Sequence, residues 1–177
     1  MDITIRKANL EDIGPYTNLL QQTYQAAYTD ESIGLGADCF SKKTFDTEDS
    51  QRYFKSRLTD TDTQKTWLAF DGDKLVGAIT GILNNDAEAE LTGFYVEPKH
   101  QGKGIGQKLY ELFLNFAGDR DLLLDTYVHN VKTIKIYEKW GWKLDATRGE
   151  GGYFYRRWPE WPEGLQAKCL YMRLKKR

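Results

Sequence analysis

The residues that most clearly indicate a binding site form a glycine-rich loop at residues 101–106 (QGKGIG), between a strand-like segment and a helix-like one. Backbone N–H groups at the start of a helix have no partner within the helix, and the helix dipole adds positive potential there. Glycines let an anion approach such amides closely, and Lys103 adds a positive charge. The loop therefore suits a diphosphate group, although a surface turn before a helix explains the loop alone equally well.

Two common nucleotide-binding patterns do not fit this loop. The dinucleotide fingerprint G-x-G-x-x-G fails, because its third glycine would fall at Gln107 when counted from Gly102 and at Leu109 when counted from Gly104. The mononucleotide pattern G-x-x-x-x-G-K-[ST] is absent as well. The loop therefore needs a different interpretation.

Composition excludes several classes of function. The chain has 177 residues, with 25 Lys and Arg against 26 Asp and Glu and a net charge of −1. This length fits a single domain over residues 1–177, whose core needs neither a disulfide nor a metal ion. The balanced charge argues against nucleic acid or a membrane surface as the main partner. No segment approaches the ~20 apolar residues that span a bilayer.

The expected location follows from the amino terminus and the cysteines. The first ten residues carry charges where a signal peptide has its apolar stretch. Cys39 and Cys169 are far apart in sequence and form neither a disulfide framework nor a metal knuckle. We expect a cytoplasmic protein without a metal site.

Hydrophobic periodicity predicts a mixed α+β domain. One helix is expected to begin after a cap at Asn9, and the Asp71-Gly72-Asp73 turn indicates a hairpin. A strand–helix–strand step over residues 88–128 predicts one parallel pair in an otherwise antiparallel sheet. Residues 29–47 are expected to form a loop with room for one helical turn, and residues 149–165 are a stretch rich in Gly, Pro and Trp. The other expected helices are 48–59, 104–117 and 130–140, and the expected strands are 2–7, 65–71, 74–83, 88–96, 121–128, 142–148 and 166–174.

Two motifs carry a family resemblance. Residues 101–106 have the form Q-x-x-G-x-G, which resembles the coenzyme A pyrophosphate loop of the GNAT acetyltransferases. Asn130 and the run 137–142 (YEKWGW) resemble the family's N-x-x-A-x-x-x-Y-x-K-x-G-F segment, with Thr133 at the Ala position and Trp142 at the Phe position. The resemblance implies the GNAT fold, a central, mostly antiparallel sheet with a parallel step at the cofactor site and helices on both faces.

The same resemblance implies acetyl-CoA as the cofactor and assigns its binding to three parts of the chain. The backbone of Phe94, Tyr95 and Val96 would pair with the pantetheine amides. Asn130 would bond the same arm, or cap the helix that follows it. The loop amides would bind the diphosphate, and they belong to Gln101, Gly102, Lys103, Gly104, Ile105 and Gly106.

The implied reaction is the direct transfer of an acetyl group to an amine, which requires proton transfers. An alkylammonium titrates near ~10.4 and a thiol near ~8.5, so one group must take a proton and another must give one. By resemblance Tyr137 is the donor to the leaving thiolate and a cofactor contact, with a core aromatic as the alternative. Glu90 matches the base of some relatives, with a solvated edge carboxylate as the alternative.

The two histidines and the strand around Glu90 carry further expectations. His129 is a rival base, because imidazole titrates near neutrality, whereas His100 is expected to lie on the surface. Strict alternation along 88–96 would place Thr92, Phe94 and Val96 on the same face as Glu90.

The acceptor is indicated only by charge. In the family the first two helices line the acceptor side, and carboxylates there would attract a cationic amine, although a solvated acidic face is the alternative. The acidic residues of this region are Asp30, Glu31, Asp38, Asp46, Glu48, Asp49, Asp60 and Asp62.

We expect a primary amine of a small molecule as the acceptor. A polyamine is one candidate, because residues 23–48 resemble the amino-terminal part of bacterial spermidine/spermine N-acetyltransferases. The alternatives are a protein or peptide amino group and a coenzyme A-binding module without catalysis, and a homodimer stays open. Residues 153–162 (YFYRRWPEWP) depart from the family pattern and would form an acceptor-site flap, a dimer contact or an aromatic latch, with apolar packing as the default.

Overall fold

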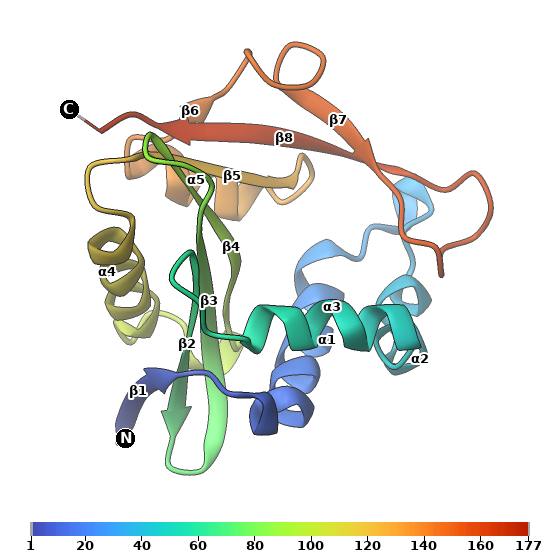
Figure 1. Cartoon of the computed structure of the whole chain (residues 1–177). Coiled ribbons are helices and arrows are strands. Elements are labelled where there is room, and N and C mark those ends of the chain that lie inside the picture. Colours follow the sequence, from blue (N-terminus) through green and yellow to red (C-terminus); the bar gives the residue numbers. More distant parts are fainter. Residues whose placement is uncertain (1, 177) are drawn as a thin grey trace.

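The computed structural model describes residues 2–176, which build one mixed sheet between two helical layers (Figure 1). All neighbouring strands are antiparallel except the parallel pair β4 and β5. In spatial order the strands are β1 (Ile3–Lys7), β2 (Gln64–Asp71), β3 (Lys74–Leu83), β4 (Glu88–Val96), β5 (Asp121–Tyr127), β8 (Ala167–Leu174) and β6 (Lys143–Leu144), with β7 (Tyr153–Arg156) also paired to β8.

The helices divide between the two faces of the sheet, each over its own apolar core. Tyr16 and Phe54 belong to the core under the amino-terminal helices, whereas Leu109, Phe113 and Trp142 belong to the core on the opposite face. No helix in residues 2–176 is long and apolar enough to cross a membrane. The helices are α1 (Ile13–Tyr28), α2 (Lys42–Phe45), α3 (Glu48–Leu58), α4 (Ile105–Ala117) and α5 (Val131–Lys139).

The start of the first helical segment follows the capping chemistry of its sequence. The Asn9 side chain accepts a hydrogen bond from the Glu11 amide, and Asp12 accepts one from the Asn9 amide at 2.9 Å. Asp12 also pairs with Arg6 at 2.6 Å. These bonds satisfy amides that the helix itself leaves unpaired, so the predicted cap at Asn9 is confirmed.

Two expected stretches differ from the structure. The predicted loop at 29–47, with its one allowed helical turn, contains α2 and also two 3₁₀ turns, Glu31–Ile33 and Ala37–Phe40. The predicted strand at 142–148 is wrong beyond its first residues, because only β6 forms. Gly149, Gly151 and Gly152 adopt positive φ angles of 57°, 60° and 98°. They turn the chain out of the sheet before it returns as β7, which continues along the same edge of β8.

Arg173 on β8 holds together a charge network around the buried carboxylate of Asp145. Its guanidinium bonds Asp145 at 2.9 Å, Glu88 at 2.9 Å and Asp121 at 3.1 Å. The Asp145 side chain is only 3% exposed. Burial alone would raise the pKa of Asp145, but hydrogen bonds from Thr147 and Arg173 outweigh it and lower the pKa.

We expect Arg173→Leu to lower the free energy of unfolding by about 3 kcal/mol near neutral pH, because it leaves the buried Asp145 carboxylate without its cation. The lowered pKa of Asp145 means that its contribution is complete above the unfolded pKa of ~3.9 and disappears as the pH falls through the folded value. Urea titrations near neutral and acidic pH should show the penalty shrinking in acid. Arg52→Leu, which removes only exposed ion pairs, should cost under ~1 kcal/mol, and an equal penalty for both variants would contradict this account.

Candidate active site

The site opens where β4 and β5 separate. The two strands pair over only three positions, from Glu88 opposite Asp121 to Glu90 opposite Leu123. Beyond Glu90 the two strands diverge (Figure 1). A cleft of about 1380 Å³ is lined there by residues of β4, the carboxyl end of β5 and the surrounding helices. Along this side of residues 91–96, β4 has no strand partner in the described chain. Its backbone N–H and C=O groups are therefore free to bind an extended ligand.

A β-bulge in β4 changes which side chains face this cleft. Thr92 is opposite Thr80 and Tyr95 is opposite Ala78, so residues 93 and 94 together face a single residue of β3. Gly93 adopts a φ of +57°, which permits the extra residue. The expected common face of residues 90, 92, 94 and 96 is therefore wrong. Phe94 and Val96 pack with the core under α4, whereas Tyr95 packs with the core under α1.

The glycine-rich loop lies at the mouth of the cleft, at the amino end of α4. Gly102 and Gly104 have φ angles of +75° and +80°, and a Cβ atom at either would meet nothing within 4 Å. No side chain caps α4, and its first turn has no acidic residue. The Gln101 side chain donates to the Val96 carbonyl at 3.0 Å and ties the loop to β4. This geometry presents amides with positive potential to an anion.

The loop residues do not all contribute in the same way. Gln101, Gly102, Gly104 and Gly106 line the cleft, whereas Lys103 does not. Ile105 is 2% exposed and belongs to the core of α4, so only its backbone is available to a ligand.

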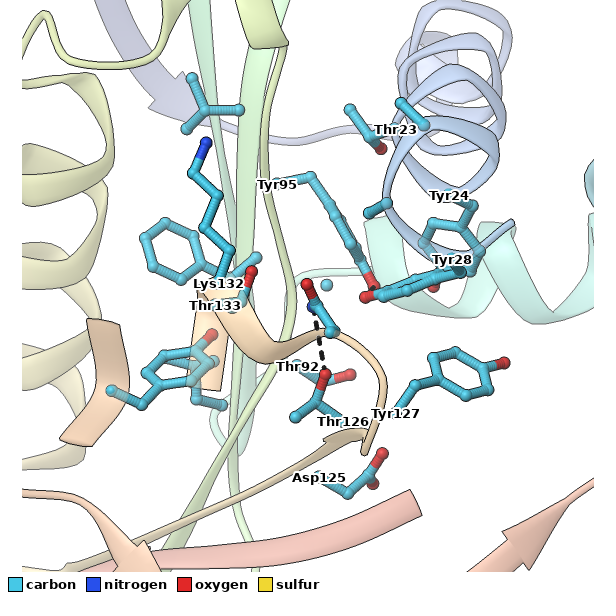
Figure 2. Close-up of a pocket in the computed structure, with 18 of the residues that line it drawn as sticks. Thr23, Tyr24, Tyr28, Thr92, Tyr95, Asp125, Thr126, Tyr127, Lys132 and Thr133 are labelled. Atoms are coloured by element: carbon cyan, nitrogen blue, oxygen red, sulfur yellow. Dashed lines mark hydrogen bonds between the residues drawn. The ribbon is translucent and has the colours of Figure 1, made fainter. Parts of the chain in front are cut away.

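The second motif lies on α5, across the cleft from β4. Asn130 directly precedes the helix, but its side chain caps none of the helix amides. The Asn130 side chain donates instead to the Thr126 hydroxyl at 3.4 Å, the dashed line in Figure 2. Tyr137 lines the cleft and is 6% exposed. It packs edge-on against Trp140 with ring centroids 6.1 Å apart. Burial raises the pKa of Tyr137, so its hydroxyl keeps its proton at neutral pH.

The three candidates for proton transfer lie in different surroundings. Glu90 lines the cleft, is half-buried, and forms no ion pair within residues 2–176. The His129 Nε2 atom donates to the Tyr28 carbonyl at 2.9 Å, and its Nδ1 atom is buried. His100 is not the expected surface residue; its side chain is 13% exposed, between Asp71 at 3.2 Å and Glu97 at 2.6 Å. Glu90 is therefore the uncommitted carboxylate of the site.

A group of tyrosines lines the acceptor side, opposite the loop. Figure 2 shows Tyr95 from β4 pointing toward Tyr28 from α1. Asp125 and Tyr127 of β5 lie below this pair of tyrosines in the same view. The hydroxyls of Tyr28 and Tyr95 lie 3.3 Å apart, and the Tyr24 ring is 4.8 Å from the Tyr95 ring. Burial raises the pKa of Tyr28 and Tyr95, which keeps both phenols neutral. Helical periodicity identifies Tyr24 only as an apolar position, so the sequence gives no sign of its place in the site.

The charges of the acceptor side differ from the expected acidic surface. Of the eight carboxylates named for it, only Asp49 lines the cleft, and it is exposed and paired with Arg52 at 3.0 Å. Asp125 and Glu160 also line the cleft, as does Glu90. Cationic side chains of equal number line it too, so the acceptor side is not an acidic surface. The lining cationic residues are Arg57, Lys132, Arg156 and Arg157.

The aromatic segment 153–162 is both a packed strap and a wall of the cleft. The rings of Trp158 and Trp161 stack with centroids 6.0 Å apart, and the Trp161 indole donates to the Cys39 carbonyl at 3.2 Å. Glu160 accepts a hydrogen bond from Thr47 at 2.8 Å. The default expectation of apolar packing is confirmed, and the segment fixes one side of the acceptor space against α1–α3.

Comparison with known families decides the relationship. Residues 20–142 match the Acetyltransferase (GNAT) family, which is more than half of the chain. The chain belongs to this GNAT family. Among curated relatives, the spermine/spermidine N(1)-acetyltransferase of Bacillus subtilis is 22% identical over 89 residues, 45% of this chain and 59% of that protein. The L-methionine sulfoximine/L-methionine sulfone acetyltransferase of Salmonella typhimurium is 25% identical over 126 residues, 59% of this chain and 72% of that protein.

Solved structures of GNAT proteins share the whole architecture. The PaiA N-acetyltransferase of Thermoplasma acidophilum, in complex with coenzyme A, has a TM-score of 0.66 at 20% identity, with 100% of both chains covered. YncA of Salmonella typhimurium, with acetyl-CoA, has a TM-score of 0.62 at 18% identity, covering 99% of this chain and 94% of that one. At these identities the likeness shows the fold, and the expected GNAT fold is confirmed.

Proposed function

We propose that this GNAT protein is an acetyl-CoA-dependent N-acetyltransferase that acts on a primary amine of a small molecule, by direct attack within a ternary complex. The observation that carries the proposal is the separation of β4 and β5 beside the uncapped amino end of α4. It offers a strand edge for an amide-containing arm and a helix start for a diphosphate, along one continuous cleft.

The residues present fit coenzyme A. The open space above Gly102 and Gly104 leaves room for a diphosphate against the loop amides. The free edge of Phe94, Tyr95 and Val96 suits the pantetheine arm, and Asn130 lines the same cleft. Related GNAT proteins have been crystallised with coenzyme A or acetyl-CoA, which supports the assignment.

Two side chains would manage the protons. When bound, acetyl-CoA supplies the acetyl group as a thioester. Glu90 takes a proton from the acceptor ammonium, directly or through water, so that a neutral amine attacks. Tyr137, protonated at neutral pH, donates to the sulfur as it leaves. Both residues line the cleft, which supports these roles.

The enclosure of the acceptor side favours a small molecule over a protein surface. Helices α1 and α3 and residues 156–160 surround it. The named relatives act on spermine or spermidine and on methionine analogues, all of which are amines. A polyamine remains one candidate acceptor.

The proposal is tested by incubating the protein with acetyl-CoA and a panel of amines, amino acids and peptides. We expect thiol release together with a mass increase of the acceptor by one acetyl group. Tight coenzyme A binding without thiol release from any acceptor would contradict the proposal and support a binding module without catalysis.

Glu90→Gln should lower kcat/KM for the amine by about 100-fold near neutral pH, because the amide cannot take a proton. The defect should shrink as the pH approaches ~10.4, where an alkylamine loses its proton without help. Steady-state rates across this pH range measure both effects. Glu138→Gln, an exposed position of α5 outside the cleft, is the matched control. A loss that stays constant with pH would contradict the role of Glu90 as the base.

A further inference from the structure

Arg57 is a cation of the acceptor side without a counter-ion. It projects from α3, lines the cleft and is half-buried. Its Nη1 atom donates to the neutral Gln64 side chain at 3.1 Å, and its guanidinium lies 4.8 Å from the centre of the Tyr53 ring. Its Nε atom is buried without a hydrogen-bond partner, and no carboxylate in residues 2–176 pairs with it. A half-buried guanidinium with one buried, unpaired nitrogen and no anion beside it is unfavourable, so this position favours an anionic ligand.

The other cationic side chains of the cleft, and Glu160 with them, are already paired, hydrogen-bonded or solvated by water. Arg156 is already bound to Asp125 at 2.6 Å. Arg157 and Lys132 are exposed, so water can solvate them. Glu160 receives hydrogen bonds from hydroxyl groups of the chain at the start of α3. Arg57 is thus distinguished as a half-buried cation that lines the cleft and has no ion-pair partner within residues 2–176.

The position of Arg57 relative to Glu90 gives the site two poles. Its partner Gln64 lies opposite Ile82, which lies opposite Glu90. Gln64 and Glu90 therefore share one row and one face of the sheet, about 10 Å apart at the usual strand spacing. Arg57 bonds Gln64 at one end of this row, and Glu90 stands at the other end. A half-buried cation and an uncommitted carboxylate at separate positions of one cleft match a ligand that carries both an anion and an ammonium.

We propose that the acceptor carries a carboxylate as well as its primary amine, and that Arg57 binds this carboxylate and determines the specificity. The planar guanidinium can bind both oxygens of a carboxylate. The ammonium would then lie toward Glu90. This inference rests on the proposed function and adds the class of substrate, an amino-carboxylic acid, in preference to a polyamine.

The test compares each L-amino acid that is turned over with its amide and its decarboxylated amine. These three keep the amine and the side chain, and only the first carries the carboxylate. We expect the acid to have a kcat/KM at least about 10-fold above the other two, as a charge-assisted pair provides. Arg57→Gln should remove most of this preference by raising KM for the acid, and Arg57→Lys should restore part of it.

The comparison within each variant separates specificity from folding, because a partly unfolded sample lowers the rates with all three acceptors alike. Arg52→Gln, on the same helix but outside the cleft, should keep the full preference. Equal turnover of acids, amides and polyamines by the wild type, or a preference that survives in Arg57→Gln, would overturn this inference and leave the proposed function intact. Absence of thiol release with every acceptor would instead overturn the proposed function.

Discussion

Replacing Tyr137 with Phe is expected to lower kcat by more than about tenfold and to leave the affinity for acetyl-CoA nearly unchanged. The ring packs against Trp140 and Trp142, and a phenylalanine ring preserves these contacts. The hydroxyl alone is lost, and without it the leaving sulfur must depart as an unprotonated thiolate. Steady-state kinetics for turnover and calorimetry for cofactor binding separate the two effects.

Tyr110 provides the matched control for this substitution. It is also a buried tyrosine, stacked on Trp140 with ring centroids 4.5 Å apart, but it does not line the cleft. Its hydroxyl accepts a hydrogen bond from the Trp142 indole at 3.0 Å, so Tyr110→Phe should cost about 1 kcal/mol of stability. Turnover in the folded enzyme should stay at the wild-type level. Equal kcat values for the two variants would show that Tyr137 is only a core aromatic.

Gly104→Asp should weaken coenzyme A binding by about 100-fold, because it places a negative charge at the amino end of α4, where the diphosphate would bind. At an effective dielectric constant near 20, two like charges about 5 Å apart repel by roughly 3 kcal/mol. The loop 101–106 has room for the Asp side chain, since a Cβ atom at Gly104 meets nothing within 4 Å. Its φ of +80° is one that Asp and Asn tolerate better than other residues.

Gly104→Asn is the isosteric control, with the same backbone demand and no charge. Calorimetry on both variants should give a much smaller loss for Asn than for Asp, and raised salt should narrow the gap. If Gly104→Asp and Gly104→Asn weakened coenzyme A binding equally, backbone strain would be the cause, and the electrostatic role of the loop would be contradicted.

Local signals predicted much of the fold. The bounds of β3 and β4 equal the expected ranges, and the hairpin at Gly72 and the cap at Asn9 form as their turn and capping chemistry indicates. The bulge at Gly93 was not predicted, because the alternation of side chains along one strand does not reveal an inserted residue until the partner strand is known. The turn between β6 and β7, where Gly149, Gly151 and Gly152 adopt positive φ angles, was not predicted, because a strand-like run does not show where its pairing with β8 stops.

The site was predictable where one segment contains its chemistry. The loop 101–106 and the α5 segment with Tyr137 are continuous in sequence, and both line the cleft. The acceptor side is assembled from α1, α3, β5 and residues 156–160, which only tertiary packing brings together. Arg57 and Tyr24 therefore gave no local signal. Of the eight acidic residues that did give one, four form a cap or surface ion pairs, namely Asp30, Glu48, Asp49 and Asp60.

Amide NMR of the labelled protein, titrated with coenzyme A and separately with pantetheine, tests the central claim most directly. Coenzyme A should shift the backbone amide signals of Gly102, Gly104 and Gly106, together with those of β4 residues 94–96. Pantetheine, which lacks the diphosphate, should shift only the β4 signals. Saturating coenzyme A that leaves the loop amides unmoved, or pantetheine that moves them equally, would contradict the account.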